Sequence, residues 1–278
     1  MKKESVFLGQ VFPLVLTFVI FLVLSSFIYG EVILLNLFSK QDILKQIHIA
    51  DIIVGTTIYL KTSVDFAIFI GNLMSKYPGW KNRVAIEIGT AVGNAFGTML
   101  VLAIWSFFRE IEWLLAIMIF LAALVLFNMA EEGFEHALAS VKNKTSLYAK
   151  TIMIFETVLK MITKITGPIV DKILPNTSVK GMDKKSFWGV FSLSFTIPFI
   201  LGLDDFAGYV PLFNIVNVLG FSIGVLAGHM ILNGFLFLAP EKTITVVKNS
   251  VISFLGSVAF ILLALWGFWE VFKILFVH

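Results

Sequence analysis

Asp65 is a single acidic residue in an otherwise apolar stretch, "TSVDFAIFIG" (residues 62–71). A charged side chain at the centre of a membrane helix costs roughly 2.5–3.5 kcal/mol, so it is retained where it faces a cavity, an ion or a partner group. Lys61 lies one helical turn before Asp65, where it could neutralise the carboxylate or exchange a proton or cation with it. Asp65, Lys61 and the intervening Ser63 therefore form the first candidate site.

The composition places this site in a membrane. Hydrophobic residues make up 58% of the chain, charged residues 14%, and the mean hydropathy is +0.94, values far from those of soluble domains. The chain has no cysteine, which excludes disulfides, iron–sulfur clusters and thiolate metal sites. It also lacks a Walker loop, a nucleophile elbow and a dinucleotide-binding fingerprint, so we expect no enzyme, no resident cofactor and no nucleic-acid partner.

Seven uncharged or nearly uncharged runs are long enough to cross a bilayer as helices. They cover residues 5–30, 49–74, 88–108, 113–130, 186–203, the later part of 206–240, and 249–269. The first run has the basic start of a signal peptide but exceeds the usual apolar length, so we interpret it as a retained span. We expect helix breaks at Thr62 or Ser63 in the second span and at Pro198 or Gly202 in the fifth.

The segment between the fourth and fifth spans contains an amphipathic helix. Its apolar residues recur at helical spacing on one face: Ile154, Val158, Ile162, Ile165 and Ile169. Its charged residues lie four apart on another face: Glu156, Lys160 and Lys164. Because lysines are expensive in hydrocarbon, we predict a helix lying in the cytoplasmic membrane interface and not an eighth span.

Basic residues gather on one side of this seven-span arrangement. If the N-terminus is cytoplasmic, the cytoplasmic segments hold 16 of the 21 lysines and arginines. Such a bias predicts a multi-pass protein of the plasma (inner) membrane, with its N-terminus in the cytoplasm and its C-terminus outside.

Two parts of the chain resemble each other. "GTAVGNAFGTML" from Gly89 and "GFSIGVLAGHMI" from Gly220 share three glycines four residues apart, followed by methionine. "SVDFAI" (63–68) and "SLSFTI" (192–197) precede them at nearly equal distances. Because three spans separate the copies, the second is inverted in the membrane, as in many secondary transporters. We predict one membrane domain, 1–278, divided into 1–47 (first span and outer loop), 48–136 (repeat 1), 137–185 (cytoplasmic loop) and 186–278 (repeat 2).

The repeat extends the candidate site beyond the first stretch. It pairs Asp65 with Ser194, near Ser192, whose hydroxyls either face the site or bond to their own helix. Further polar candidates are Asp204, Asp205, Asn94 and His229. The two aspartates are expected at the outer mouth of the pathway, and Asn94 and His229 deeper, either as ligands or as hydrogen-bonded structure.

Three quoted stretches resemble the TerC family of the LysE-type transporter superfamily. They are "TSVDFAIFIGNLMSKYPGWKNRVAIEIGTAVGNAFGTM", "LLAIMIFLAALVLFNMAEEGFEH" and "FSLSFTIPFILGL". The resemblance implies an all-α fold of seven spans, with two inverted three-helix repeats and one N-terminal helix, and export of divalent cations such as manganese. For a transported metal, we name Asp65 and Asp205 as the candidate ligands. Ser194 stands where the family has a second aspartate, and Phe66 where it has an asparagine.

Two functions follow as hypotheses. The first is a secondary transporter, an exporter of a cation or small solute, that uses Asp65 near the midplane, with the lipid bilayer and the transported species as partners. The second is a non-transporting scaffold or accessory protein that keeps the fold and docks a partner or anionic lipid through its basic helix. Self-association into a homo-oligomer remains open in both.

Overall fold

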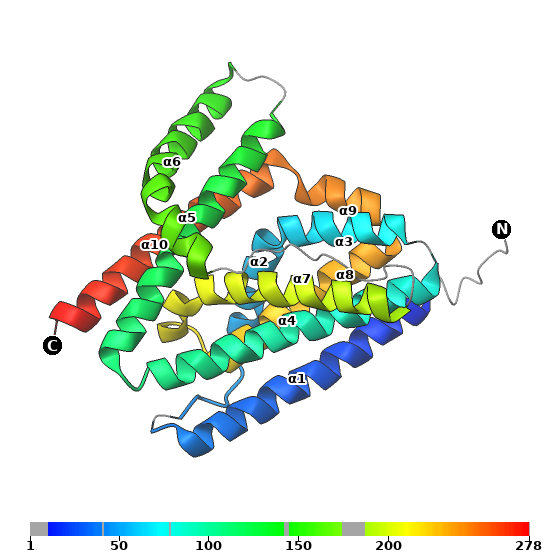
Figure 1. Ribbon diagram of the computed structural model, residues 1–278, viewed down its shortest axis with the longest axis horizontal. Helices are drawn as coiled ribbons and strands as arrows, with labels where there is room; N and C mark the ends of the chain where they lie inside the picture. Colours follow the sequence, from blue (N-terminus) through cyan, green and yellow to red (C-terminus); the bar gives the residue numbers. More distant parts are fainter. Residues whose placement is uncertain (1–10, 41, 78, 142–144, 174–186, 278) are drawn as a thin grey trace. The chain divides into compact units, whose positions relative to one another are not determined.

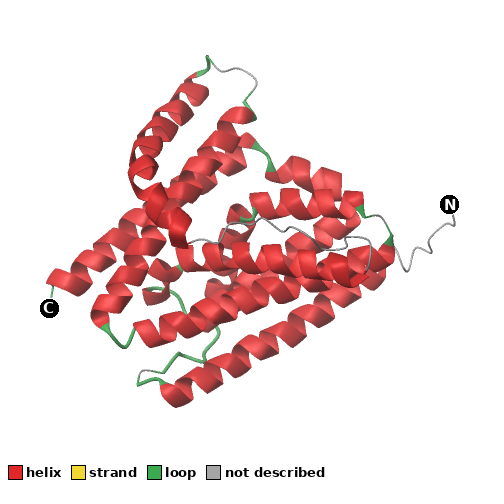
Figure 2. Ribbon diagram, in the orientation of Figure 1, coloured by secondary structure: helices red, strands yellow, loops and turns green. Residues whose placement is uncertain are grey.

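The computed structural model describes residues 11–40, 42–77, 79–141, 145–173 and 187–277. Within these ranges every regular element is a helix (Figure 2). Five helices are long and apolar enough to cross a membrane, namely α1 (Phe12–Phe38), α4 (Trp80–Phe108), α5 (Glu112–Ala139), α8 (Val218–Leu238) and α10 (Ser250–Phe276). The chain is therefore an all-helical membrane protein.

The chain forms two compact units. Unit 1 contains Met1–Val101, Thr177–Leu203 and Val216–Ile244, and unit 2 contains Leu102–Asn176, Asp204–Ile215 and Thr245–His278. Both predicted repeats contribute helices to both units. The two units therefore do not test the predicted division of the chain into two repeats, which stays a prediction.

In unit 1, the second predicted span is broken. α2 (Ile49–Thr62) and α3 (Val64–Lys76) are bent by 67° at a break around Ser63, whose φ of −83° and ψ of 32° end the first helix. The break predicted at Thr62 or Ser63 is confirmed. α7 (Phe187–Gly208), in contrast, continues through Pro198 as one helix, so the break predicted there is wrong. Neighbouring groups can take over the hydrogen bonds that a proline frees in a membrane helix.

The broken pair α2–α3 follows α8 from one end to the other. Near the start of α8, the Asn217 side chain donates to the carbonyl oxygen of Leu44, just before α2. Near the end of α8, a shallow pocket is lined both by Met74 from α3 and by Ala239 and Lys242. We call this second end the basic end, because Lys76, Lys81, Arg83 and Lys242 lie there. The pair thus begins and ends at opposite ends of unit 1.

Glycines let two pairs of helices in unit 1 approach closely. A Cβ atom on Gly224 of α8 would lie 2.3 Å from the Ile52 carbonyl oxygen of α2. A Cβ atom on Gly93 of α4 would lie 2.3 Å from the Phe195 carbonyl oxygen of α7. Small residues allow such backbone contact where lipid supplies no hydrophobic driving force. The two glycine triplets therefore join α8 to α2 and α4 to α7.

Unit 2 is built on α5 and α10, which pack along each other with a 3-10 helix, η2 (Val210–Asn214). Its core contains Phe127, Phe134 and Phe260. α6 (Leu147–Ile173) folds back along α5 (Figure 1) and buries Ile152 and Leu159 there. It is not among the helices apolar enough to span.

The exposed face of α6 carries part of the predicted apolar stripe. Ile154, Val158 and Ile165 are exposed, whereas Ile162 packs partly against the core and the side chain of Ile169 lies outside the described residues. Glu156 is largely buried and bonds to Lys160 at 2.5 Å, a contact that raises the pKa of Lys160. The placement of α6 in the cytoplasmic membrane interface stays a prediction.

Candidate functional site

A chain of hydrogen bonds runs through the interior of unit 1 and links three helices. The hydroxyl of Tyr59, in the last turn of α2, lies 2.7 Å from Nδ1 of His229 in α8. The amide nitrogen of Asn233, one turn further along α8, lies 3.1 Å from Nε2 of His229 and donates to the Thr90 hydroxyl of α4 at 2.8 Å. His229, Asn233 and Thr90 are fully buried, and Tyr59 nearly so. We call these four residues the polar chain.

The hydrogen bonds fix the state of His229. Asn233 donates to Nε2, so Nε2 carries no proton and the ring is neutral, with its hydrogen on Nδ1 facing Tyr59. The ring also lies 4.9 Å from the ring of Phe66, in the first turn of α3. One imidazole thus contacts the helix before the break and the helix after it.

A buried carboxylate lies beside the polar chain. Glu87 of α4 is fully buried, and its Oε1 accepts a hydrogen bond from Thr17 of α1. The Thr90 hydroxyl donates to the Glu87 backbone carbonyl at 3.0 Å. Glu87 Oε2 has no hydrogen-bond partner among the described residues. Arg83, one turn before, donates instead to the Phe237 carbonyl oxygen at 3.1 Å and lies over the Phe237 ring.

Five predicted site residues lie near the break or along α4 and α8. Asn94 is buried, with its Oδ1 unpartnered among the described residues, and His229 belongs to the polar chain. Ser63 is buried at the break itself, and its hydroxyl is likewise unpartnered there. Lys61 is half-buried in the last turn of α2. Asp65 occupies the first turn of α3, and its side chain lies outside the described residues.

The predicted residues of α7 are placed differently. Ser194 is fully buried, and its hydroxyl donates to the Val190 carbonyl oxygen of its own helix at 2.7 Å. A Cβ atom added to Gly89 of α4 would lie 2.9 Å from the Cβ of Ser194, so the residue at position 89 has to be glycine for α4 and α7 to pack this closely. Ser192 is half-buried, and its carbonyl oxygen accepts from Thr196. Asp204 and Asp205 lie in the last turns of α7, with side chains outside the described residues.

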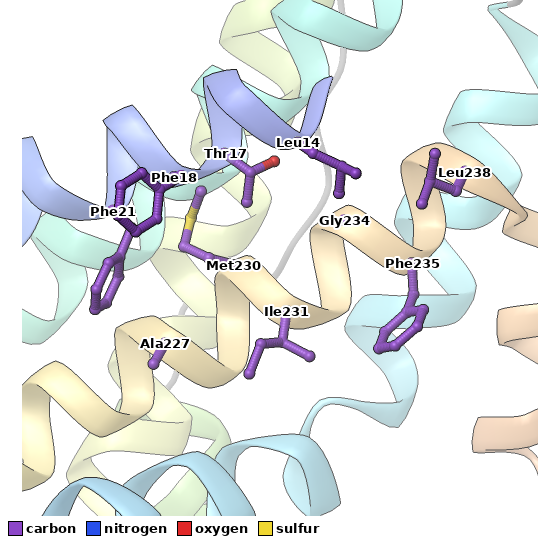
Figure 3. Close-up of a pocket in the computed structure, with 10 residues that line it drawn as sticks. All are labelled: Leu14, Thr17, Phe18, Phe21, Ala227, Met230, Ile231, Gly234, Phe235 and Leu238. Atoms are coloured by element: carbon purple, nitrogen blue, oxygen red, sulfur yellow. The ribbon is translucent and has the colours of Figure 1, made fainter. Parts of the chain in front are cut away.

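A groove of about 440 Å³ lies between α1 and α8 (Figure 3). Its walls are aliphatic and aromatic, from residues such as Leu14, Phe18, Ile231 and Phe235, and Thr17 is the hydrogen-bonding side chain among them. Because Thr17 also bonds to Glu87, it separates this apolar groove from the buried carboxylate.

Four groups of the site escaped the sequence reasoning: Tyr59, Thr90, Asn233 and the Thr17–Glu87 pair. Asn233 had a signal, because it lies four residues after His229 and therefore on the same helical face. Tyr59 and Thr17 had none, since their partners are on other helices. No cluster of three or more His, Asp or Glu suited to a metal ion occurs among the described residues.

Comparisons with family models, with curated proteins and with solved structures found no match. The function is therefore inferred from the site itself.

Proposed function

We propose that this protein is a secondary membrane transporter, an exporter of a cation or small solute, that uses Asp65 at the broken helix. The observation that carries this proposal is the helix break at Ser63, which lies beside the buried polar chain. Tyr59 before the break and Phe66 after it both contact His229 of that chain. Broken helices at membrane depth occur where they are buried in protein or line a water-filled cavity, and in secondary transporters they bring helix ends to the substrate site.

The course of the broken pair supports a transmembrane arrangement of seven spans. Since α2–α3 runs from one end of α8 to the other, it is counted as a single broken span, which adds to the five long helices. α7, whose stretch Phe187–Thr196 is apolar, makes the seventh. In this proposal the basic end faces the cytoplasm, with the N-terminus inside and the C-terminus outside the inner membrane.

The helix pairing supports the inverted repeat. Each glycine triplet contacts the first helix of the other copy, α4 against α7 and α8 against α2, and the third helices α5 and α10 pack together. Reciprocal contacts of this kind are expected when two copies are related by a twofold axis in the membrane plane. The predicted site at Asp65 would then lie where the copies meet.

The substrate class follows from charge. Asp65 provides a carboxylate for a cation, and by resemblance to TerC proteins a divalent metal such as manganese is the first ion to test. Ser194 supplies no second carboxylate at the matching position. A monovalent cation or a small solute is therefore included in the same proposal.

One observation favours a second function, a scaffold that docks a partner or anionic lipid. α6 leaves Ile154, Val158 and Ile165 exposed and carries lysines on the same helix. A helix with an apolar face and basic residues binds anionic membrane surfaces. This role needs no transport and no central site.

Flux through reconstituted protein tests the proposal. Liposomes that contain the wild type or Asp65→Asn are compared for Mn²⁺, other divalent metals, protons, alkali ions and small solutes. We expect one class to cross with the wild type and to fall to the level of empty liposomes with Asp65→Asn, because the amide has no charge for a cation. Asp51→Asn, at the start of α2, is the control and should retain flux. Flat responses to the whole panel would favour the scaffold.

A further inference from the structure

We propose that α4 and α8 hold a binding site for a monovalent metal cation, formed by Glu87, Thr90 and Asn233, with Asn94 one turn further along α4. This site is separate from Asp65. It rests on the proposed function in that its ion would drive the transport, although the binding itself can be tested without transport.

Unpartnered oxygens are the first argument. Glu87 Oε2, Asn94 Oδ1 and Asn233 Oδ1 are buried and lack a hydrogen-bond donor among the described residues. A buried acceptor without a partner costs about 1–3 kcal/mol, more if it is charged, so something must approach these atoms. A metal cation accepts lone pairs from several oxygens at once.

The placement of the groups is the second argument. Glu87, Thr90 and Asn94 lie on one face of α4, at intervals of three and four residues. Asn233 of α8 reaches this face, because its amide nitrogen lies 2.8 Å from the Thr90 hydroxyl oxygen. Both donor bonds of that amide go to His229 and Thr90, which leaves the amide oxygen as an acceptor.

Charge decides between a metal cation and other ligands. Glu87 is the one acidic group of the set, and when it is ionised the neutral ring of His229 does not balance its charge. Arg83 contacts the Phe237 carbonyl oxygen and not Glu87. In a low-dielectric interior a single negative charge is matched by a single positive charge, which favours Na⁺, K⁺ or Li⁺ over a divalent ion. A proton would satisfy one oxygen of Glu87 and leave both amide oxygens unpaired.

Thermal unfolding in detergent measures this binding. The wild type is titrated with NaCl, KCl or LiCl against choline chloride at equal total chloride. We expect at least one alkali ion to raise Tm by a few degrees at saturation, because an ion that binds only the folded state stabilises it. No flux is involved, so a failed transport assay leaves this result intact, and the reverse also holds.

The isosteric variant Glu87→Gln should lose the ion-dependent rise while it keeps a cooperative transition in choline. Glu31→Gln removes another carboxyl with a buried, unpartnered oxygen from α1 and should keep the full rise. A wild type equally stable in all four salts would overturn the proposal. So would a Glu87-dependent stability that responds to pH alone, since the ligand would then be a proton.

Discussion

His229 is held as a neutral ring by its two hydrogen-bonding neighbours. Tyr59 faces Nδ1 and Asn233 faces Nε2, so each ring nitrogen has one partner. If one partner is removed, the buried ring nitrogen that it bonded to is left unpaired, which destabilises the folded protein. At the scale of the residue, the Tyr59 hydroxyl is therefore the group that keeps Nδ1 of His229 paired.

Replacing that hydroxyl tests this dependence. We expect Tyr59→Phe to lower the free energy of unfolding by about 1–3 kcal/mol, because Nδ1–H of His229 would lack an acceptor. Unfolding in mixed micelles with increasing SDS measures the change. Tyr29→Phe, whose tyrosine is 40% exposed on α1, is the matched control and should change stability by less than about 0.5 kcal/mol. Equal effects would mean that the hydrogen bond contributes nothing.

Sequence spacing located some polar residues but not their partners. It singled out Asn94 and His229, and both are buried in unit 1. Glu87 and Arg83 also lie four residues apart on α4, a spacing that suits an ion pair, yet the side chain of each bonds to another helix. Glu87 bonds to Thr17 of α1, while Arg83 bonds to the Phe237 carbonyl oxygen of α8. Local spacing describes one helix, whereas these contacts join different helices.

At the scale of the element, glycines set the distance between helices. Gly224 and Gly234 lie on the same helix, α8, but only Gly224 meets backbone atoms of α2. A methyl group on Gly234 would meet nothing within 4 Å. The same substitution at the two positions therefore separates close packing from helix propensity.

We expect Gly224→Ala to destabilise the protein by about 1–3 kcal/mol, because the new Cβ would lie 2.3 Å from the Ile52 carbonyl oxygen and force α2 away. Gly234→Ala should be neutral or stabilise by up to about 1 kcal/mol, because alanine favours helix. SDS-induced unfolding of both variants measures the difference. A Gly224→Ala protein as stable as the wild type would contradict the close contact.

Helix ends were only partly predictable. The small polar pair Thr62 and Ser63 indicated the break correctly, although only the Thr62 hydroxyl bonds to a backbone group there, the Tyr59 carbonyl oxygen at 3.0 Å. Pro198 indicated a break that the structure lacks. The first span was predicted to end at Gly30, yet α1 continues to Phe38, because one glutamate, Glu31, does not stop a helix.

At the scale of the whole molecule, the proposed orientation rests on the two ends of unit 1. The basic end gathers Lys76, Lys81, Arg83 and Lys242 from segments far apart in the sequence, and Lys40 lies beyond the other end of α1. Composition alone identified a membrane protein, whereas the sides predicted from the lysine count stay a prediction. The charged run 49–74 was predicted to be a span from its length, and its crossing as a broken helix depends on how α2–α3 follows α8.

Labelling of single cysteines tests the orientation, and the absence of native cysteine makes every label specific. Lys40→Cys and Lys242→Cys are both exposed positions. In intact cells, we expect a membrane-impermeant maleimide to label Lys40→Cys and to leave Lys242→Cys unlabelled until the membrane is permeabilised. Ser75→Cys, at the end of α3, should behave like Lys242→Cys, because a broken span carries the chain across. Labelling of Ser75→Cys from outside would show that α2–α3 returns to its starting side, and the repeat could not then be inverted.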